Sequence, residues 1–389
     1  MLKKKSMKVK HTLSRHPFRI PPGVYKSLVF FILSLFFYTQ DAFCCSTFML
    51  KKGGKLIVGH NLDSGRHKSG LVIINKRGVE KQGKSWSELA YGKAVPNPPL
   101  KWISKYGSVT FAKYRDFPDG GVNEAGLFIV EMSLPGTGFP KDQSKPLLFM
   151  MLWMQYVLDN FESTAQVVKS AHDLTIDGWN WHFFTADRQG NAAVIEFLDG
   201  QVVVRQGPTL PVPVLENSTY DREMERLKTY KGFGGDKPID LDNKKQPTFV
   251  QGARMLKDFN PSQQSAVDYG FDILATFGWE GTQWSYVCDL NALKVYFKTR
   301  ASPKIKTLDF KSFNLSCQTP VKMLDIHTDL SGAVDKNFRE YSIEYNREFI
   351  RNNFVAGNYE PVFKKHGSTL EAAVDRFAAY PESTKCKCK

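Results

Sequence analysis

Residues 45–63 have the sequence CSTFMLKKGGKLIVGHNLD, and this segment decides how the chain begins to fold. The apolar residues 48–50 and 56–58 lie on either side of a Gly53-Gly54 pair. A Gly-Gly pair between two apolar runs is typical of the tight turn of a β-hairpin. The sequence therefore predicts two antiparallel strands, the second of which returns Asp63 to the neighbourhood of Cys45.

The segment before this hairpin has the layout of a secretory signal peptide. Residues 1–26 contain eight Lys or Arg and no acidic residue, residues 27–38 are mostly apolar, and polar residues 39–41 follow. The apolar run of 12 residues is shorter than the roughly 20 that a membrane-spanning helix needs. We therefore expect a leader that is removed, with an uncleaved membrane anchor as the alternative.

The cleavage site of such a leader is expected to have small residues one and three positions before the cut. Ala42 and Cys44 meet this rule if cleavage follows Cys44. A lipid anchor on Cys44 or Cys45 is the competing interpretation, but Phe43 is too large for the position before a lipidated cysteine. We predict a signal peptide over residues 1–44 and an exported protein, periplasmic or secreted, without stable membrane insertion.

Cleavage after Cys44 would make Cys45 the first residue of the mature chain. Its thiol is then a nucleophile, and its free α-amine, with an ordinary pKa of about 8, can accept the thiol proton. The hairpin places Asp63 where it can hold and orient this amine. The alternative is that Cys44 and Cys45 pack or form disulfides, which six cysteines in an exported protein would allow.

The remaining cysteines carry less information. Cys288 and Cys317 could form a disulfide, which spacing alone does not decide. The tail places Cys386 and Cys388 between lysines, and we interpret it as a frayed terminal tag in preference to a soft-metal or disulfide site. No spacing of His and Cys matches a zinc site, so neither a metal nor another cofactor is expected.

Further motifs follow the hairpin in order along the chain. Together with residues 45–48 and 59–63, they resemble the choloylglycine hydrolase family, which includes bile salt hydrolases, penicillin V acylases and related linear-amide hydrolases of the N-terminal nucleophile superfamily. The later matching segments are residues 121–127, 181–197, 217–221, 252–254 and 282–298. No single motif is decisive, but the ordered series over residues 45 to about 310 is a strong signal.

The resemblance gives several residues a role in amide cleavage. Cys45 is implied as the nucleophile, and the side-chain amide of Asn217 as a hydrogen-bond donor to the oxyanion that forms when the thiolate attacks. The backbone amide of Ser133 matches the second donor. Arg254 matches a late arginine of the family's site, although an arginine in a helix is usually solvated. The alternative for Asn217 is an Asx turn before Ser218.

His60 is a departure from the family pattern. Many members have an arginine at this position, three residues before the aspartate. A protonated His60 could replace that arginine beside the thiolate, and activity would then fall as the pH rises. The alternative is a structural histidine on the second strand of the hairpin.

The fold class follows from the pattern of hairpins and from the family resemblance. Hairpins at residues 45–63, 121–133, 181–205 and 283–310, with helices between them, predict α+β structure with antiparallel sheets. The resemblance implies a four-layer αββα sandwich of two such sheets. Residues 45–389 are expected to form a single hydrolase domain with a peripheral extension from about residue 320. Apolar spacing predicts helices at residues 145–160, 162–174, 249–259 and 338–353.

Half of the net charge of +14 lies in residues 1–44, because the residues that follow contain 45 basic against 38 acidic residues. Such a mildly basic surface without a recognition motif excludes nucleic acid as the expected partner. We predict a hydrolase of linear amides that forms an acyl-enzyme with an N-acylated small molecule of the bile salt, penicillin V, acyl homoserine lactone or N-acyl amino acid type. The alternative is an exported binding protein of the same fold without turnover. A homo-oligomer is left open.

Overall fold

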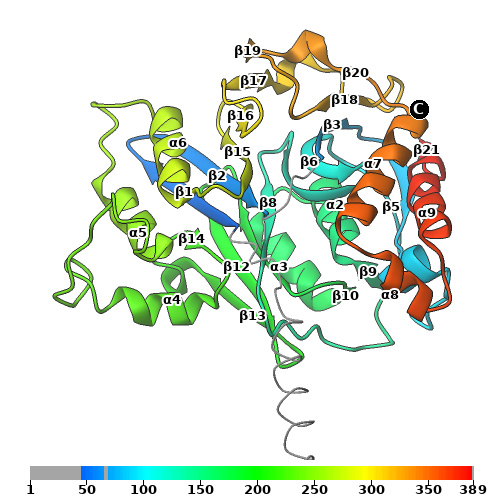
Figure 1. Cartoon of the computed structure of the whole chain (residues 1–389), viewed down its shortest axis with the longest axis horizontal. Coiled ribbons are helices and arrows are strands. Elements are labelled where there is room, and N and C mark those ends of the chain that lie inside the picture. Colours follow the sequence, from blue (N-terminus) through cyan, green and yellow to red (C-terminus); the bar gives the residue numbers. More distant parts are fainter. Residues whose placement is uncertain (1–44, 65–68, 388–389) are drawn as a thin grey trace, which may run out of the picture. The chain divides into compact units, whose positions relative to one another are not determined.

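A computed structural model describes residues 45–64 and 69–387, so the expected leader and Cys388 lie outside the described residues. Two large sheets, both mainly antiparallel, form the centre of this part of the chain (Figure 1). The first sheet has seven strands, which lie in the order β14 (Val214–Leu215), β1 (Ser46–Lys52), β2 (Lys55–Asp63), β15 (Thr282–Asp289), β16 (Lys294–Thr299), β17 (Lys306–Asp309) and β19 (Gly332–Ala333).

The second sheet has nine strands and packs against the first. Its strands lie in the order β13 (Gln201–Gln206), β12 (Ala192–Leu198), β11 (Trp181–Ala186), β8 (Phe128–Ser133), β7 (Phe117–Asn123), β6 (Ser108–Tyr114), β3 (Leu71–Asn75), β18 (Lys322–Asp325) and β20 (Arg339–Glu340). Two small sheets pair β9 (Leu147–Phe149) with β10 (Thr175–Asp177), and β4 (Val79–Gln82) with both β5 (Lys101–Ile103) and β21 (Lys385–Cys386).

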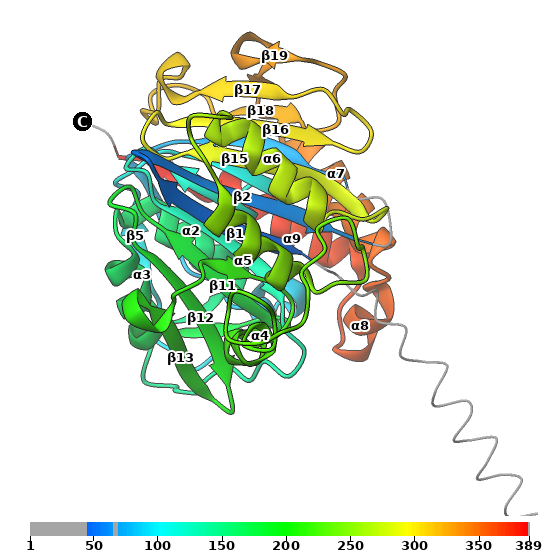
Figure 2. The same ribbon diagram turned by 90° about the vertical axis from the view of Figure 1, so that its left-hand side faces the viewer.

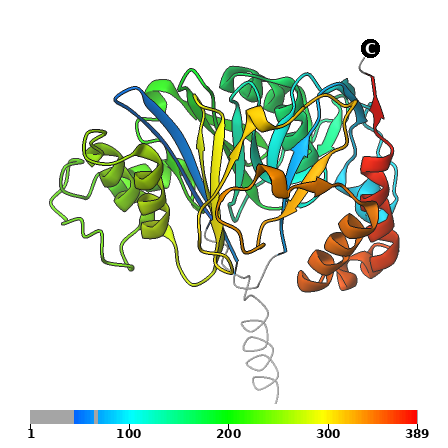
Figure 3. The same ribbon diagram turned by 90° about the horizontal axis from the view of Figure 1, so that it is seen from above.

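Helices cover the outer faces of both sheets, as the view in Figure 3 shows. On the seven-stranded sheet lie α5 (Thr248–Asp258) and α6 (Ala266–Phe277), preceded by α4 (Tyr220–Leu227). On the nine-stranded sheet lie α2 (Met150–Asn160), α3 (Thr164–Asp173), α7 (Ile343–Ala356), α8 (Glu360–Lys365) and α9 (Leu370–Glu382). Short helical turns occupy Ser87–Tyr91, Gly207–Thr209, Phe310–Ser312 and Asp335–Asn337. The predicted four-layer αββα sandwich is confirmed.

The β1–β2 hairpin forms as the sequence predicts. Its strands pair from Ser46 opposite Asn61 to Lys52 opposite Lys55. Gly53 and Gly54 make the turn with φ angles of 60° and 73°, which residues with a Cβ rarely adopt. Figure 2 shows β1 and β2 side by side beneath α5 and α6.

Two predicted helices begin later than expected, each because a short strand precedes it. The helix expected at residues 145–160 begins at Met150, since β9 occupies the residues before it. The helix expected at residues 338–353 begins at Ile343, after β20. Its start is fixed by Ser342, whose side chain accepts a hydrogen bond from the Tyr345 backbone N–H.

The segment after residue 320 was expected at the periphery, yet it contributes to the core. Strand β18 lies beside β3 within the nine-stranded sheet. Helices α7, α8 and α9 bury Phe354, Phe363 and Phe377 against the outer face of that sheet together with residues of α2. These rings are at most 1% exposed, so the segment is a structural layer of the sandwich.

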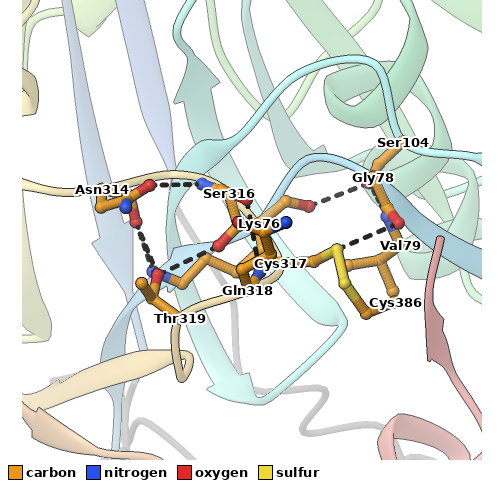
Figure 4. Close-up of a disulfide and its surroundings, with 10 residues drawn as sticks. All are labelled: Lys76, Gly78, Val79, Ser104, Asn314, Ser316, Cys317, Gln318, Thr319 and Cys386. Atoms are coloured by element: carbon orange, nitrogen blue, oxygen red, sulfur yellow. Dashed lines mark hydrogen bonds between the residues drawn. A yellow bond between two sulfur atoms is a disulfide. The ribbon is translucent and has the colours of Figure 1, made fainter. Parts of the chain in front are cut away.

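A disulfide attaches the C-terminal tail to the body of the fold (Figure 4). Cys317 pairs with Cys386 at a Cα–Cα distance of 5.4 Å, and Cys386 lies opposite Val79 in the β21–β4 ladder. The prediction of a frayed tail is therefore wrong up to residue 387, and Cys317 does not pair with Cys288, which is a buried free cysteine. Closing a loop of 69 residues stabilises the fold by about 4 kcal/mol in the chain-entropy model.

Candidate active site

Cys45 is the first described residue and immediately precedes β1. It is 3% exposed and belongs to the apolar cluster that the two large sheets share. Burial, together with the negative charges of Glu131 and Asp63, raises the pKa of the Cys45 thiol well above its ordinary value. A hydrogen bond from the Asp63 backbone N–H to the sulfur opposes this shift only partly. The thiol therefore needs a base before it can act as a nucleophile.

Asp63 is the last residue of β2. When the β1–β2 register is continued by one pair, the residue before Asp63 lies opposite Cys45. Its carboxyl is buried, and neither oxygen makes a well-formed hydrogen bond within the described residues. Burial raises the pKa of Asp63 to about 7, although the side chains of Thr282 and Trp279 oppose the shift. The hairpin thus brings a carboxyl group beside the thiol, at a site where it lacks full compensation for its burial.

Asn217 approaches Cys45 from the other side of β1. Strand β14 pairs with β1 so that Leu215 lies opposite Thr47. When this register is continued by two residues, Asn217 lies opposite Cys45. Asn217 is half-buried, while the neighbouring Glu216 side chain contacts the first turn of α5. Cys45, Asp63 and Asn217, which come from separate motifs of the sequence, therefore lie at the same end of the seven-stranded sheet.

His60 lies between the two sheets. It is 1% exposed, pairs with Thr47 across the hairpin and has its ring centroid 5.4 Å from that of Tyr286. Burial lowers the pKa of His60 to about 3, so its imidazole is neutral near neutral pH. A neutral imidazole supplies no positive charge, so this low pKa argues against the hypothesis that a protonated His60 replaces the family arginine, and a fall of activity with rising pH is not expected from this residue.

The burial of neutral His60 has a measurable consequence for stability. In the unfolded chain the imidazole titrates near its ordinary pKa of about 6.5, whereas in the folded chain it titrates at about 3. Between these values the unfolded state binds one more proton. This residue should therefore lower the free energy of unfolding by about 1.4 kcal/mol for each unit that the pH falls between about 6 and 4.

We expect His60→Phe to remove this contribution, so that the free energy of unfolding of the variant falls less steeply with acid than that of the wild type. Urea denaturation at pH 4 to 7.5 measures the difference in slope. His172→Gln, at an exposed histidine, is the matched control and should leave the slope unchanged. Parallel curves for wild type and His60→Phe would contradict a neutral buried imidazole.

Arg254 does not reach this group of residues. Helix α5 turns Phe249, Val250 and Ala253 toward the core, which directs Arg254 to solvent. Its side chain is 45% exposed and forms an ion pair with Asp258 one turn later. The expectation that Arg254 contributes to the site is corrected accordingly.

Ser133 lies at the end of β8 in the second sheet, half-buried and opposite Trp181 of β11. The structure therefore places it outside the sheet that carries Cys45. Glu131, two residues earlier on the same strand, acts electrostatically on the Cys45 thiol. Burial and the charge of Asp119 raise the pKa of Glu131 well above its ordinary value.

Glu131 and the ion pair beside it were not predicted from the sequence. Lys113 Nζ lies 3.1 Å from Asp119 Oδ1, and both charges act on Glu131. The available signal was an acidic residue within the apolar strand FIVEMS at residues 128–133. Burying a carboxyl group in such a strand costs free energy, which either hydrogen-bonding and charged partners or a role in the reaction must offset.

The model of one protein family matches residues 44–264, and that family is described as linear amide C–N hydrolases, choloylglycine hydrolase family. The chain belongs to this family. Penicillin V acylase of Pectobacterium atrosepticum is a relative with 26% identity over 263 residues, which cover 56% of this chain and 69% of the relative.

Solved structures of similar fold cover more of the chain than the family model does. Penicillin V acylase from Agrobacterium tumefaciens superimposes with a TM-score of 0.64 at 23% identity, covering 77% of this chain and 98% of that one. A variant of the conjugated bile acid hydrolase from Clostridium perfringens gives a TM-score of 0.60 at 20% identity, covering 74% and 98%. At these identities the structures establish the common fold.

Proposed function

We propose that this protein is a cysteine amidohydrolase that cleaves a linear amide through an acyl-enzyme on Cys45. Membership of the linear amide hydrolase family supports amide hydrolysis as the reaction class. The observation that carries the choice of nucleophile is the convergence on Cys45 of Asp63 from β2 and Asn217 from the segment after β14. This combination supplies a thiol, a carboxyl group beside it and an amide donor.

The proposed reaction begins when removal of residues 1–44 frees the α-amine of Cys45. The amine accepts the thiol proton, and the carboxylate of Asp63 holds the resulting ammonium. The sulfur attacks the amide carbonyl, and the Asn217 side chain donates a hydrogen bond to the oxyanion. The C–N bond breaks as the ammonium returns its proton to the leaving amine. Water then attacks the thioester, the amine accepts its proton, and the acid is released with the thiol restored.

The proposed substrate is an N-acylated small molecule. The relatives are named for penicillin V and for conjugated bile acids, and acyl homoserine lactones and N-acyl amino acids belong to the same chemical class.

We further propose that the protein acts after export, in the periplasm or outside the cell. The basic and apolar layout of residues 1–41 supports this location. The disulfide between Cys317 and Cys386 agrees with an oxidising compartment. No helix among residues 45–64 and 69–387 is long and apolar enough to cross a bilayer.

The second candidate function is an exported binding protein of the same fold. It is favoured because the two residues expected to bring a positive charge to the site do not do so: burial lowers the pKa of His60 to about 3, and the exposed side chain of Arg254 pairs with Asp258. A binding protein would retain its ligand after Cys45 is replaced, whereas the amidohydrolase would lose turnover.

The experiment that tests the proposal is the intact mass of the exported protein, with sequencing of its N-terminus and assay of an acyl-amide panel. We expect a chain that begins at Cys45 and that hydrolyses at least one amide of the classes named above. A chain that begins at Met1 or at Cys44 would leave Cys45 without a free amine and would refute this mechanism.

A further inference from the structure

The segment that carries Asn217 is closed on itself by Tyr220. The Tyr220 hydroxyl donates to the Val212 carbonyl at 3.0 Å and accepts from the Val212 N–H at 3.2 Å. Between these residues, β14 pairs with β1. Asn217 thus belongs to a short loop whose two ends are joined, with one side fixed to the strand that follows Cys45.

The other side of this loop is fixed to the second sheet by Glu196. Helix α4 begins after Thr219, whose side chain makes no capping hydrogen bond. Instead, Glu196 Oε1 on β12 accepts the Tyr220 backbone N–H at 2.8 Å. A carboxylate at this position compensates the unsatisfied donors and the positive end of the helix dipole. The start of α4, three residues after Asn217, is therefore held by a side chain from a different sheet.

His182 fixes the orientation of Glu196 in turn. The two residues face each other across the β11–β12 pair, and both are at most 1% exposed. His182 Nδ1 lies 3.3 Å from the same Oε1 atom that binds Tyr220.

We propose that Glu196, oriented by His182, is a positioning residue that holds Asn217 opposite Cys45 through the start of α4. The inference rests on the proposed function, because it concerns the donor to the oxyanion. Such a donor is effective only when it is already aimed at the position where the negative charge develops. Glu196 holds the chain at the Tyr220 backbone N–H, three residues after Asn217, so this contact acts on Asn217 through the backbone of residues 217–220.

The first test compares Glu196→Ala with Glu196→Gln. We expect Glu196→Ala to lower kcat about tenfold to a hundredfold, a part of the loss typical of a missing oxyanion donor, with KM changed less than twofold. Glu196→Gln should retain most of kcat, since its amide oxygen can accept the same hydrogen bond. Alkylation of Cys45 by iodoacetamide needs no oxyanion donor, so its rate should be unchanged in both variants.

A double-mutant cycle separates positioning from a general structural role. If Glu196 acts through Asn217, then Glu196→Ala should cause no further loss of kcat in an Asn217→Ala background. Independent, additive losses would overturn the inference. Asp187→Asn is the matched control, because Asp187 is a buried carboxylate that accepts the Thr164 N–H at the start of α3 in the same manner. It should lower the melting temperature without changing kcat.

A further variant keeps the test valid if Glu196→Ala folds poorly. Thr219→Asp gives α4 a local N-cap, so in combination with Glu196→Ala it should restore the melting temperature but not kcat. Recovery of both would show a merely structural role for Glu196. A crystal structure of the same double variant provides a readout without substrate: Asn217 should be displaced from Cys45, and an unmoved Asn217 would overturn the inference even if no amide substrate were found.

Discussion

Cys45→Ala is expected to abolish amide hydrolysis, with kcat at least about 10⁴-fold below that of the wild type, as when the nucleophile of other acyl-transfer enzymes is removed. Among residues 45–64 and 69–387 the other free cysteine is Cys288, which cannot replace it because it is 1% exposed on β15 and lies within the apolar core. The loss should be in kcat, since substrate contacts remote from the sulfur remain. Cys45→Ala should therefore still bind substrate.

The measurement is amide hydrolysis followed by release of the free amine, together with intact mass to establish that the variant has the same N-terminus as the wild type. Cys288→Ala is the matched control, a deletion of the same atom at a buried site, and should retain activity. Incubation of the wild type with a thiol reagent should inactivate it with one label on Cys45. Turnover by Cys45→Ala at the wild-type rate would refute the proposed nucleophile.

The parts of the site that the sequence predicted are those fixed by local geometry. Gly53-Gly54 determines the turn, and the lengths of the two strands then carry Asp63 back to Cys45 whatever the rest of the chain does. Asn217 was found only through its motif, since its position depends on the pairing of β14 with β1 across more than 160 residues. A long-range pairing of this kind has no local signal.

The errors have a common physical origin in long-range packing. Arg254 was assigned to the site although a helix pattern does not show which neighbour its polar face meets, and α5 directs it to solvent. The charge of His60 depends on how deeply it is buried between the two sheets. The layer formed by α7 to α9 was underestimated because its aromatic residues find their partners on α2, nearly 200 residues earlier.

Buried polar residues on strands were the other omission. Glu131, His182 and Glu196 each stand within apolar stretches, where alternation alone suggests only an interior position. Their partners come from different strands or from a helix start, so the interactions that they make can be identified only in the folded chain. The cost of burying such groups must be offset by hydrogen bonds or by function, and two of them lie on the path that fixes Asn217.

The second large effect is expected for Asn217→Ala, which should lower kcat by about 10²-fold to 10³-fold and leave KM nearly unchanged. The reason is that the side-chain amide donates to an oxygen that becomes fully negative only during the attack of Cys45. A ground-state carbonyl gains little from the same donor, so substrate binding loses little when it is removed.

Steady-state kinetics on the best amide of the panel measures both parameters, and the alkylation rate of Cys45 shows whether the nucleophile is intact. Asn97→Ala is the matched control, since Asn97 is also half-buried but donates to the carbonyls of Asp142 and Lys145 in a distant loop. It should leave kcat unchanged. A rise in KM with unchanged kcat for Asn217→Ala would instead assign Asn217 to substrate binding, and the oxyanion would then have to be stabilised by backbone donors. In that case Glu196→Ala should raise KM as well, because Glu196 positions Asn217. The kinetics of Asn217→Ala and Glu196→Ala together therefore determine whether Asn217 serves substrate binding or the stabilisation of the oxyanion.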